Sequence, residues 1–297
     1  MTALLEAFKS VDVSVYHFLN GYAGHRLLDH FAGFEETNQL FKGGLFLTAY
    51  VYLWFRMGPD QRKRRRMIVA VLAGTLLALA LCRIVADVAP FRARPMYNAS
   101  IYHHPYSFPI RPDMEDWSSF PSDHAAYFFA LAFGLAYLLR RSIAVVPIML
   151  YTILWICLPR MFLGLHYLSD IVVGGALGIA TVWLAVRSEW LSRGVADRVL
   201  AFAGEKPQIF YPGAFLVCFE MSVLFDDLRH VAGSLLSAGL VTPHLLRSAL
   251  AAAAFLGFAA VAAYGMLLAL HWYLVHHDAR ASCVTAMGEH DPSRLLH

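Results

Sequence analysis

The sequence predicts an all-α fold: a polytopic bundle of about six transmembrane helices preceded by an N-terminal amphipathic interfacial helix. Of the 297 residues, 59% are hydrophobic and only 15% are charged, and the mean hydropathy is +0.53. Soluble domains carry roughly 25% charged residues, so this composition excludes an ordinary soluble domain and a disordered chain. The four cysteines form no CxxC pair, so the sequence predicts neither a zinc site nor a redox site.

Apolar runs define the predicted spans, because a helix needs about 20 mostly apolar residues to cross a bilayer. Six runs meet this requirement: 40–57, 67–89, 122–139, 143–163, 167–187 and 248–275. A seventh run, 209–228, is weaker because Glu220, Asp226 and Asp227 interrupt it.

The chain therefore divides into three predicted regions. In residues 1–39, apolar side chains recur at intervals of three and four, which is typical of an amphipathic helix on the membrane surface. A helix that precedes the first span and packs on the bundle explains the same pattern. Residues 40–190 form the predicted membrane core, and residues 191–297 form a C-terminal extension with one or two further membrane helices.

The basic residues indicate the orientation of the bundle. They crowd three alternate connections, at 56–66, 140–141 and 187–206. Because Lys and Arg favour cytoplasmic loops, the segment 90–121 and the turn 160–166 are expected on the outer side. This arrangement predicts a multi-pass membrane protein.

Three short polar segments fall on that outer side. They are 83–95 at the exit of the second span, 121–124 at the start of the third, and 160–170 between the fourth and the fifth. Ionisable residues within membrane spans are rare and usually functional. We therefore expect one site, built from several spans and facing the periplasm or the cell exterior.

The third segment pairs a histidine with a carboxylate. His166 and Asp170 are four residues apart and share one face of a helix. A carboxylate that accepts from one imidazole nitrogen leaves the other nitrogen as a nucleophile or base. Arg160 can grip two phosphate oxygens with its planar guanidinium.

The second segment opens a helix. Ser122 and Asp123 follow Pro121, so backbone N–H groups and the positive end of the helix dipole are available to an anion. His124 can donate a proton to a leaving oxygen, and Arg94 supplies another cation. Each residue also has an ordinary explanation, as a helix cap, a core histidine or an arginine at the membrane edge.

Together these motifs resemble the three-part signature of the type-2 phosphatidic acid phosphatase and vanadium haloperoxidase superfamily. The motifs that carry the resemblance are Arg94-Pro95, Pro121-Ser122-Asp123-His124, and Arg160 with His166 and Asp170. It covers about residues 80–175 by motif and about 10–190 by span layout. The resemblance implies a metal-free phosphomonoesterase or diphosphatase that needs no cofactor, and the spans exclude a soluble haloperoxidase.

The resemblance also implies a role for each residue. His166 attacks phosphorus and becomes a phosphohistidine, Asp170 orients it, and His124 protonates the leaving group. The phosphate oxygens are held by Arg94, Arg160, Ser122 and the backbone at Asp123.

The chain departs from the family pattern at three positions. The usual Lys of the first motif is Asp87, and we expect Arg83, one helical turn further back, to replace it, with Arg92 as its rival. The usual Gly of the second motif is Asp123, whose carboxylate repels a phosphate unless it points away. The usual Ser of the third motif is Pro159.

A site at the outer interface favours a substrate with a phosphate head and an apolar tail. Polyprenyl diphosphate, phosphatidic acid, phosphatidylglycerol phosphate and lipid A phosphates all qualify, and we favour an isoprenoid (di)phosphate in a bacterial plasma (inner) membrane. The expected partners are this lipid (di)phosphate and the bilayer, with no nucleic acid. Ala253 and Gly257 form a small-xxx-small pair, which suits either a homo-oligomer or internal packing.

Three alternatives stay open at this point. A phosphotransferase would pass the same phosphoryl group to a sugar or lipid hydroxyl, and a transporter would merely share the scaffold. A divalent cation site is the third, on residues that cluster in one loop: His103, His104, Asp113, Glu115 and Asp116.

Overall fold

The computed structural model describes residues 2–101, 114–139 and 142–225. All of them belong to one structural unit, residues 1–251. Several sequence predictions lie outside the described residues: the span 248–275, the Ala253–Gly257 pair, and three members of the suggested metal cluster, His103, His104 and Asp113.

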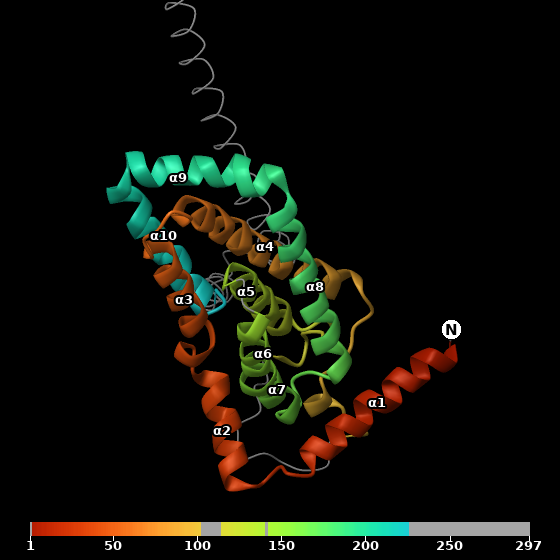
Figure 1. The fold of residues 1–297 in the computed structure, drawn as a ribbon. Coiled ribbons are helices and arrows are strands. Elements are labelled where there is room, and N and C mark those ends of the chain that lie inside the picture. The colour runs from red at the N-terminus through yellow and green to blue at the C-terminus, as the bar shows by residue number, and fades with distance from the viewer. Residues whose placement is uncertain (1, 102–113, 140–141, 226–297) are drawn as a thin grey trace, which may run out of the picture. The chain divides into compact units, whose positions relative to one another are not determined.

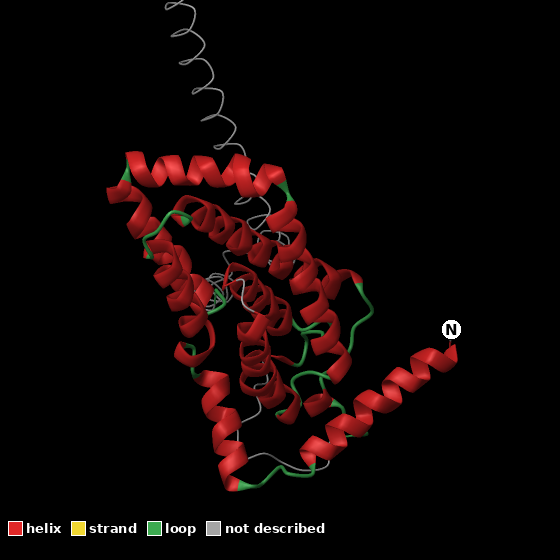
Figure 2. Cartoon of the chain, in the orientation of Figure 1, coloured by secondary structure: helices red, strands yellow, loops and turns green. Residues whose placement is uncertain are grey.

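The described part of the chain is built only from helices, as the sequence predicts (Figures 1 and 2). In chain order they are α1 (Thr2–Asn20), α2 (Arg26–Thr37), η1 (Leu40–Gly44), α3 (Leu45–Phe55), α4 (Gln61–Val88), η2 (Pro95–Tyr97), α5 (Asp123–Leu139), α6 (Ser142–Tyr151), η4 (Thr152–Cys157), α7 (Leu158–Phe162), α8 (Leu168–Arg187), η5 (Trp190–Val195), α9 (Ala196–Glu205) and α10 (Pro207–Ser222).

Five of the predicted spans fall within the described residues, and each is helical. Three stretches are long and apolar enough to cross a membrane: Gln61–Val88, Ile143–Phe162 and Leu168–Arg187, of 28, 20 and 20 residues. Leu40–Phe55 and Asp123–Leu139 are apolar but shorter. These helices support a multi-pass membrane protein.

The segment 1–39 forms two helices, α1 and α2, instead of the single helix predicted. The chain turns between them, where Gly24 adopts a φ of 87°, a left-handed conformation that favours glycine. Asp12 and Glu35 are buried, whereas Phe18 and Leu27 are 65% and 75% exposed. Each of the two helices therefore buries an acidic residue and exposes a large apolar one, which suits a helix in contact with lipid.

Helices α4, α5 and α8 form the centre of the fold, and each packs against the other two (Figure 1). A Cβ atom at Gly178 of α8 would lie 2.0 Å from the carbonyl oxygen of Ala126 in α5, and one at Gly174 would lie 2.3 Å from that of Ser122. Small residues at a helix interface let two backbones approach closely. The start of α8 is therefore held against the start of α5.

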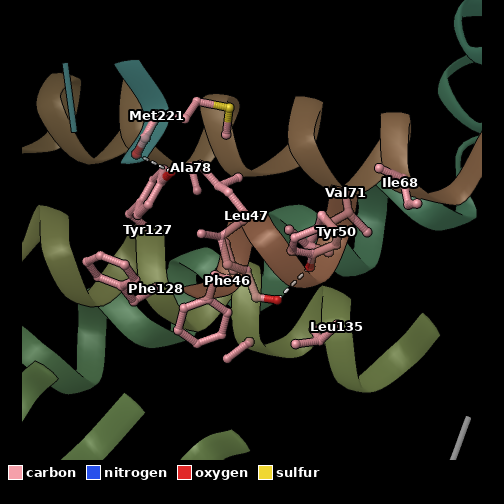
Figure 3. Close-up of a cluster of buried hydrophobic side chains, with 14 of the residues drawn as sticks. Phe46, Leu47, Tyr50, Ile68, Val71, Ala78, Tyr127, Phe128, Leu135 and Met221 are labelled. Atoms are coloured by element: carbon pink, nitrogen blue, oxygen red, sulfur yellow. Dashed lines mark hydrogen bonds between the residues drawn. The ribbon is translucent and has the colours of Figure 1, made fainter. Parts of the chain in front are cut away.

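A buried apolar cluster packs around α5 and is drawn in Figure 3. Two buried hydroxyl groups tie other elements to this helix. Tyr50 of α3 donates to the Leu131 carbonyl at 2.6 Å, and Tyr127 donates to the Met221 carbonyl of α10, also at 2.6 Å (Figure 3). Helix α10, which forms most of the weaker predicted span, is thus anchored to the core.

Arginines at the start of α4 bind the end of α3. Arg64 and Arg65 donate through Nε to the carbonyl groups of Leu53 and Trp54, at 2.8 and 2.9 Å. From Arg64 to Arg83, helix α4 rises by about 28 Å at ~1.5 Å per residue, close to the ~30 Å thickness of the hydrocarbon core of a bilayer. The basic connection and the polar segment at the exit of α4 thus lie about one membrane thickness apart along α4.

We expect Gly178→Ala to destabilise the protein by about 1–3 kcal/mol, because the added Cβ overpacks α8 against the backbone of α5. Gly213→Ala in α10 is the matched control, since nothing lies within 4 Å of a Cβ at that position. Thermal unfolding in detergent compares the two variants. Equal unfolding midpoints would contradict a close α5–α8 contact.

Candidate active site

Backbone hydrogen bonds join the three polar segments at one end of the bundle. The amide of Met96 donates to the Gly164 carbonyl at 3.0 Å, and that of Ser119 donates to the Arg92 carbonyl at 2.8 Å. The amide of Ser122 donates to the Asp170 carbonyl at 3.1 Å. The loop before α5, the exit of α4 and the α7–α8 turn therefore form one assembly.

His166 lies in the α7–α8 turn and is 2% exposed. Its Nδ1 is 2.9 Å from the carbonyl oxygen of Ser119. Because a carbonyl oxygen only accepts, Nδ1 must carry the proton, and Nε2 keeps its lone pair. Burial lowers the pKa of His166, while Asp170 opposes that shift. A neutral imidazole with a free Nε2 is the form that a nucleophile requires.

Asp170 lies close to His166, but its contact differs from the one expected. Its Oδ2 is 3.8 Å from Nδ1 of His166, beyond hydrogen-bond distance, and accepts the Tyr167 amide at 2.8 Å. The imidazole tautomer is thus fixed by the Ser119 carbonyl. Asp170 supplies negative charge on the Nδ1 side of the ring, where it can stabilise a positive charge that develops on the imidazole.

His124 forms a second histidine–carboxylate pair with its neighbour Asp123. Oδ1 of Asp123 accepts the His124 amide at 2.8 Å and lies 3.0 Å from His124 Nδ1. The other oxygen of Asp123 pairs with Arg83, whose guanidinium also stacks on Trp117 at 5.0 Å. Two departures from the family pattern thus compensate each other, because the extra carboxylate of Asp123 is neutralised by the arginine that lies one turn before the missing lysine.

Ser122 acts on the start of α5. It is fully buried, and its hydroxyl oxygen accepts the Ala125 amide at 3.3 Å. This is an N-cap contact, and it leaves the hydroxyl hydrogen of Ser122 able to donate. The N–H groups of Ser122, His124 and Ala125 all have partners within the protein, so this helix start offers an anion fewer backbone donors than a free N-terminus would.

Arg94 and Arg160 are buried guanidinium groups, 7% and 3% exposed. Arg94 donates through Nη1 to the Leu165 carbonyl at 3.0 Å, and Arg160 lies 2.7 Å from a carboxylate oxygen of Glu36 in α2. The Nε of each has no hydrogen-bond partner in the described part of the chain. Burial lowers the pKa of Arg94, the carboxylate of Asp123 opposes that shift, and the like charge of Arg160 adds to it. An anion placed here would relieve both the desolvation and the repulsion.

Arg92 is engaged differently from Arg83 and Arg94. Its Nη1 donates to Asp170 at 2.6 Å and to Ser169 at 2.8 Å, and its Nη2 donates to Asp12 of α1 at 2.6 Å. Two carboxylates therefore hold the guanidinium that the sequence offers as the rival phosphate-binding cation.

Sequence reasoning missed the acidic residues that α1 and α2 bring to this end of the bundle. Asp12, Glu35 and Glu36 are all buried, and so is Lys42, whose Nζ lies 3.8 Å from Glu35 and 2.8 Å from the Glu36 carbonyl. Lys42 carries the one available signal, since it is a charged residue inside an apolar run. The candidate metal cluster gains no support, because Glu115 and Asp116, its two described members, are exposed.

Residues 67–193 match the model of the PAP2 superfamily. The chain carries a PAP2-superfamily region. This match confirms the family expected from the motifs and spans all eight candidate site residues. The bacitracin transport permease protein BcrC of Bacillus licheniformis is 24% identical over 183 residues, which cover 58% of this chain and 78% of BcrC. No solved structure matches the chain. The family supports a membrane lipid phosphatase of the PAP2 type.

Glu35 predicts how stability depends on pH. Neither of its carboxyl oxygens has a hydrogen-bond partner in the described residues, and burial raises its pKa from 4.5 to about 7, although Arg160 and Lys42 oppose the shift. Because the pKa is higher in the folded state, the stabilising contribution is full below pH 4.5 and is lost as the pH rises through about 7.

We therefore expect the unfolding midpoint of the wild type to fall between pH 5 and pH 8 relative to that of Glu35→Gln. Thermal scans in detergent across this range measure the difference between the two curves. Glu205→Gln, at an exposed position, should follow the wild type. Parallel curves for wild type and Glu35→Gln would show that Glu35 does not titrate in this range.

Proposed function

We propose that the protein is a phosphatase that removes a phosphate from a lipid (di)phosphate at the outer face of a bacterial plasma membrane. The observation that carries the proposal is the buried pair Arg94 and Arg160 in the same assembly as His166, whose Nδ1 donates to the Ser119 carbonyl so that Nε2 keeps its lone pair. Phosphoryl transfer requires mainly positioning and neutralisation of negative charge. Guanidinium groups supply that neutralisation without a metal ion.

In the proposed reaction, Nε2 of His166 attacks phosphorus and the bond from phosphorus to the leaving oxygen breaks. His124, protonated at the start, gives its proton to the leaving oxygen. Water then attacks the phosphohistidine, His124 takes a proton from that water, and the phosphorus–nitrogen bond breaks to release orthophosphate. Asp123 holds His124 through Nδ1, which leaves His124 Nε2 to exchange the proton.

The substrate class follows from where these groups lie. They gather at one end of apolar helices, so a substrate that presents its phosphate here while its tail stays in lipid fits best. We favour polyprenyl diphosphate, with undecaprenyl diphosphate as the example and phosphatidic acid or phosphatidylglycerol phosphate as the other candidates. The relation to BcrC supports a role in the bacterial envelope.

A transport function is the second candidate, because the relative's name describes a transport permease. Charged residues that line a transport path would be spread through the depth of the membrane. Here Arg94, His124, Arg160 and His166 all belong to the joined segments at one end of the bundle. That arrangement favours a phosphatase over a transporter.

A panel of purified lipid phosphates and diphosphates, assayed for released orthophosphate in excess EDTA, tests the proposal. We expect the wild type to release phosphate from at least one lipid, and His166→Ala to reduce that release to background while keeping its unfolding midpoint. Release only when a sugar or lipid hydroxyl is added would identify a phosphotransferase. Turnover by folded His166→Ala would end the assignment of the nucleophile.

Substitution of the arginines should change different kinetic constants: KM for Arg83 and Arg94, and kcat for Arg92. Arg94→Gln removes positive charge at the phosphate, and Arg83→Gln leaves the carboxylate of Asp123 uncompensated beside it, so we expect KM to rise about tenfold or more in each. Arg92→Gln should mainly lower kcat, because Arg92 binds Asp170, the carboxylate next to the nucleophile His166. Steady-state kinetics on the best lipid of the panel measure both constants. A large rise in KM for Arg92→Gln alone would transfer the phosphate-binding role from Arg83 to Arg92.

A further inference from the structure

Asp12 is a buried acidic residue of α1 that the phosphatase mechanism does not use. It is 3% exposed and reaches the start of α8, more than 150 positions later in the chain. Its Oδ1 accepts the Ser169 amide at 2.8 Å, and its Oδ2 accepts the Ser169 hydroxyl at 2.6 Å. A carboxylate at a helix N-terminus is favourable both as a cap and toward the helix dipole. Asp12 therefore fixes the first turn of α8, the turn that carries Asp170.

Asp12 also binds the same guanidinium as Asp170 does. Arg92 donates to Asp12 and to Asp170, each at 2.6 Å. The guanidinium lies over the ring of Tyr167, 4.0 Å from its centroid. Arg92 is thus held on three sides, and the two carboxylates share its positive charge.

Sharing this charge matters because Asp170 is completely buried. In a low-dielectric site, an arginine that paired with Asp170 alone would cancel most of the negative charge that Asp170 presents to His166. With Asp12 as a second partner, the group of Arg92, Asp12 and Asp170 has a net charge of −1. That net charge lies on the Nδ1 side of His166, where positive charge develops when Nε2 bonds to phosphorus.

We propose that Asp12 is a positioning residue of the active site, which acts through Arg92 to hold Asp170 in place and to keep its negative charge available to His166. This inference rests on the proposed function, since it assigns Asp12 to the His166 reaction. It makes the N-terminal helix α1 a part of the catalytic assembly as well as a helix of the membrane interface.

The test compares Asp12→Asn with the matched control Glu6→Gln, an exposed acidic residue of the same helix. Asparagine keeps an oxygen that can accept from Ser169 but removes the charge. We expect kcat to fall about ten- to a hundredfold, as small displacements of reacting groups do, with KM changed less than about threefold. Glu6→Gln should behave as the wild type. In an Arg92→Gln background, Asp12→Asn should add little, because the two residues act through one contact.

A titration of His166 separates this role from simple structural support. His166 is faced by Asp170 from α8, Asp123 from α5, Arg94 from the α4–α5 connection, and the Ser119 carbonyl. Removing the charge of Asp12 leaves Arg92 less compensated, so the imidazolium is disfavoured. Carbon-13 NMR of histidine-labelled protein, with the His166 signal assigned by its loss in His166→Gln, should show a lower titration midpoint in Asp12→Asn. The acid limb of kcat/KM should move the same way.

The outcomes distinguish the two proposals. Wild-type kcat in Asp12→Asn would overturn the inference, and so would a fall in kcat with an unshifted His166 titration, which would indicate packing alone. If the wild type releases phosphate from no lipid in the panel, the proposed function fails. The NMR titration then still decides whether Asp12 acts on His166, because it requires no substrate.

Discussion

In the described part of the chain, four arginines lie at one end of the bundle, and in a medium of low dielectric their mutual repulsion must be offset. Three have their own carboxylate partners: Arg83 pairs with Asp123, Arg92 with Asp12 and Asp170, and Arg160 with Glu36. Arg94, by contrast, donates to a backbone carbonyl and leaves Nε unpartnered in the described chain. Arg94 thus keeps an unbalanced positive charge, and the group of Arg92, Asp12 and Asp170 keeps a net charge of −1. A phosphate is the kind of anion that completes the site.

This pattern of pairing also explains what the N-terminal helices do. Each helix buries acidic residues, Asp12 in α1 and Glu35 and Glu36 in α2, and exposes large apolar residues such as Phe18 and Leu27. Apolar side chains that face lipid cost little free energy. The buried carboxylates of Asp12 and Glu36 balance the charges of Arg92 and Arg160. Because buried ion pairs contribute little net stability, the value of Asp12 and Glu36 lies in holding charged groups at fixed positions.

The sequence predicted the helices well, because the length of each apolar run gives the length of the helix and its composition indicates a lipid environment. Its motif order also singled out three polar segments that the structure joins by backbone hydrogen bonds at one end of the bundle, and the roles of their residues stay predictions. The pairings of Arg83 with Asp123 and of Arg92 with Asp12 were not predictable, because their members are 40 and 80 positions apart. Periodicity in residues 1–39 revealed two faces but not which one meets lipid. The hydrogen bond from His166 to Ser119 was not predictable for another reason. Its acceptor is a backbone carbonyl, which every residue type carries.

The close contact of Gly174 and Gly178 with α5 has a consequence for how such a protein diversifies. Where one main chain rests on another, the separation of α8 from the start of α5 is set by direct backbone contact. The outward apolar surfaces of α1, α2 and α8 are then free to change with the lipids around them. Substitutions that suit a new membrane composition can accumulate on those surfaces while the approach of α5 and α8 is preserved.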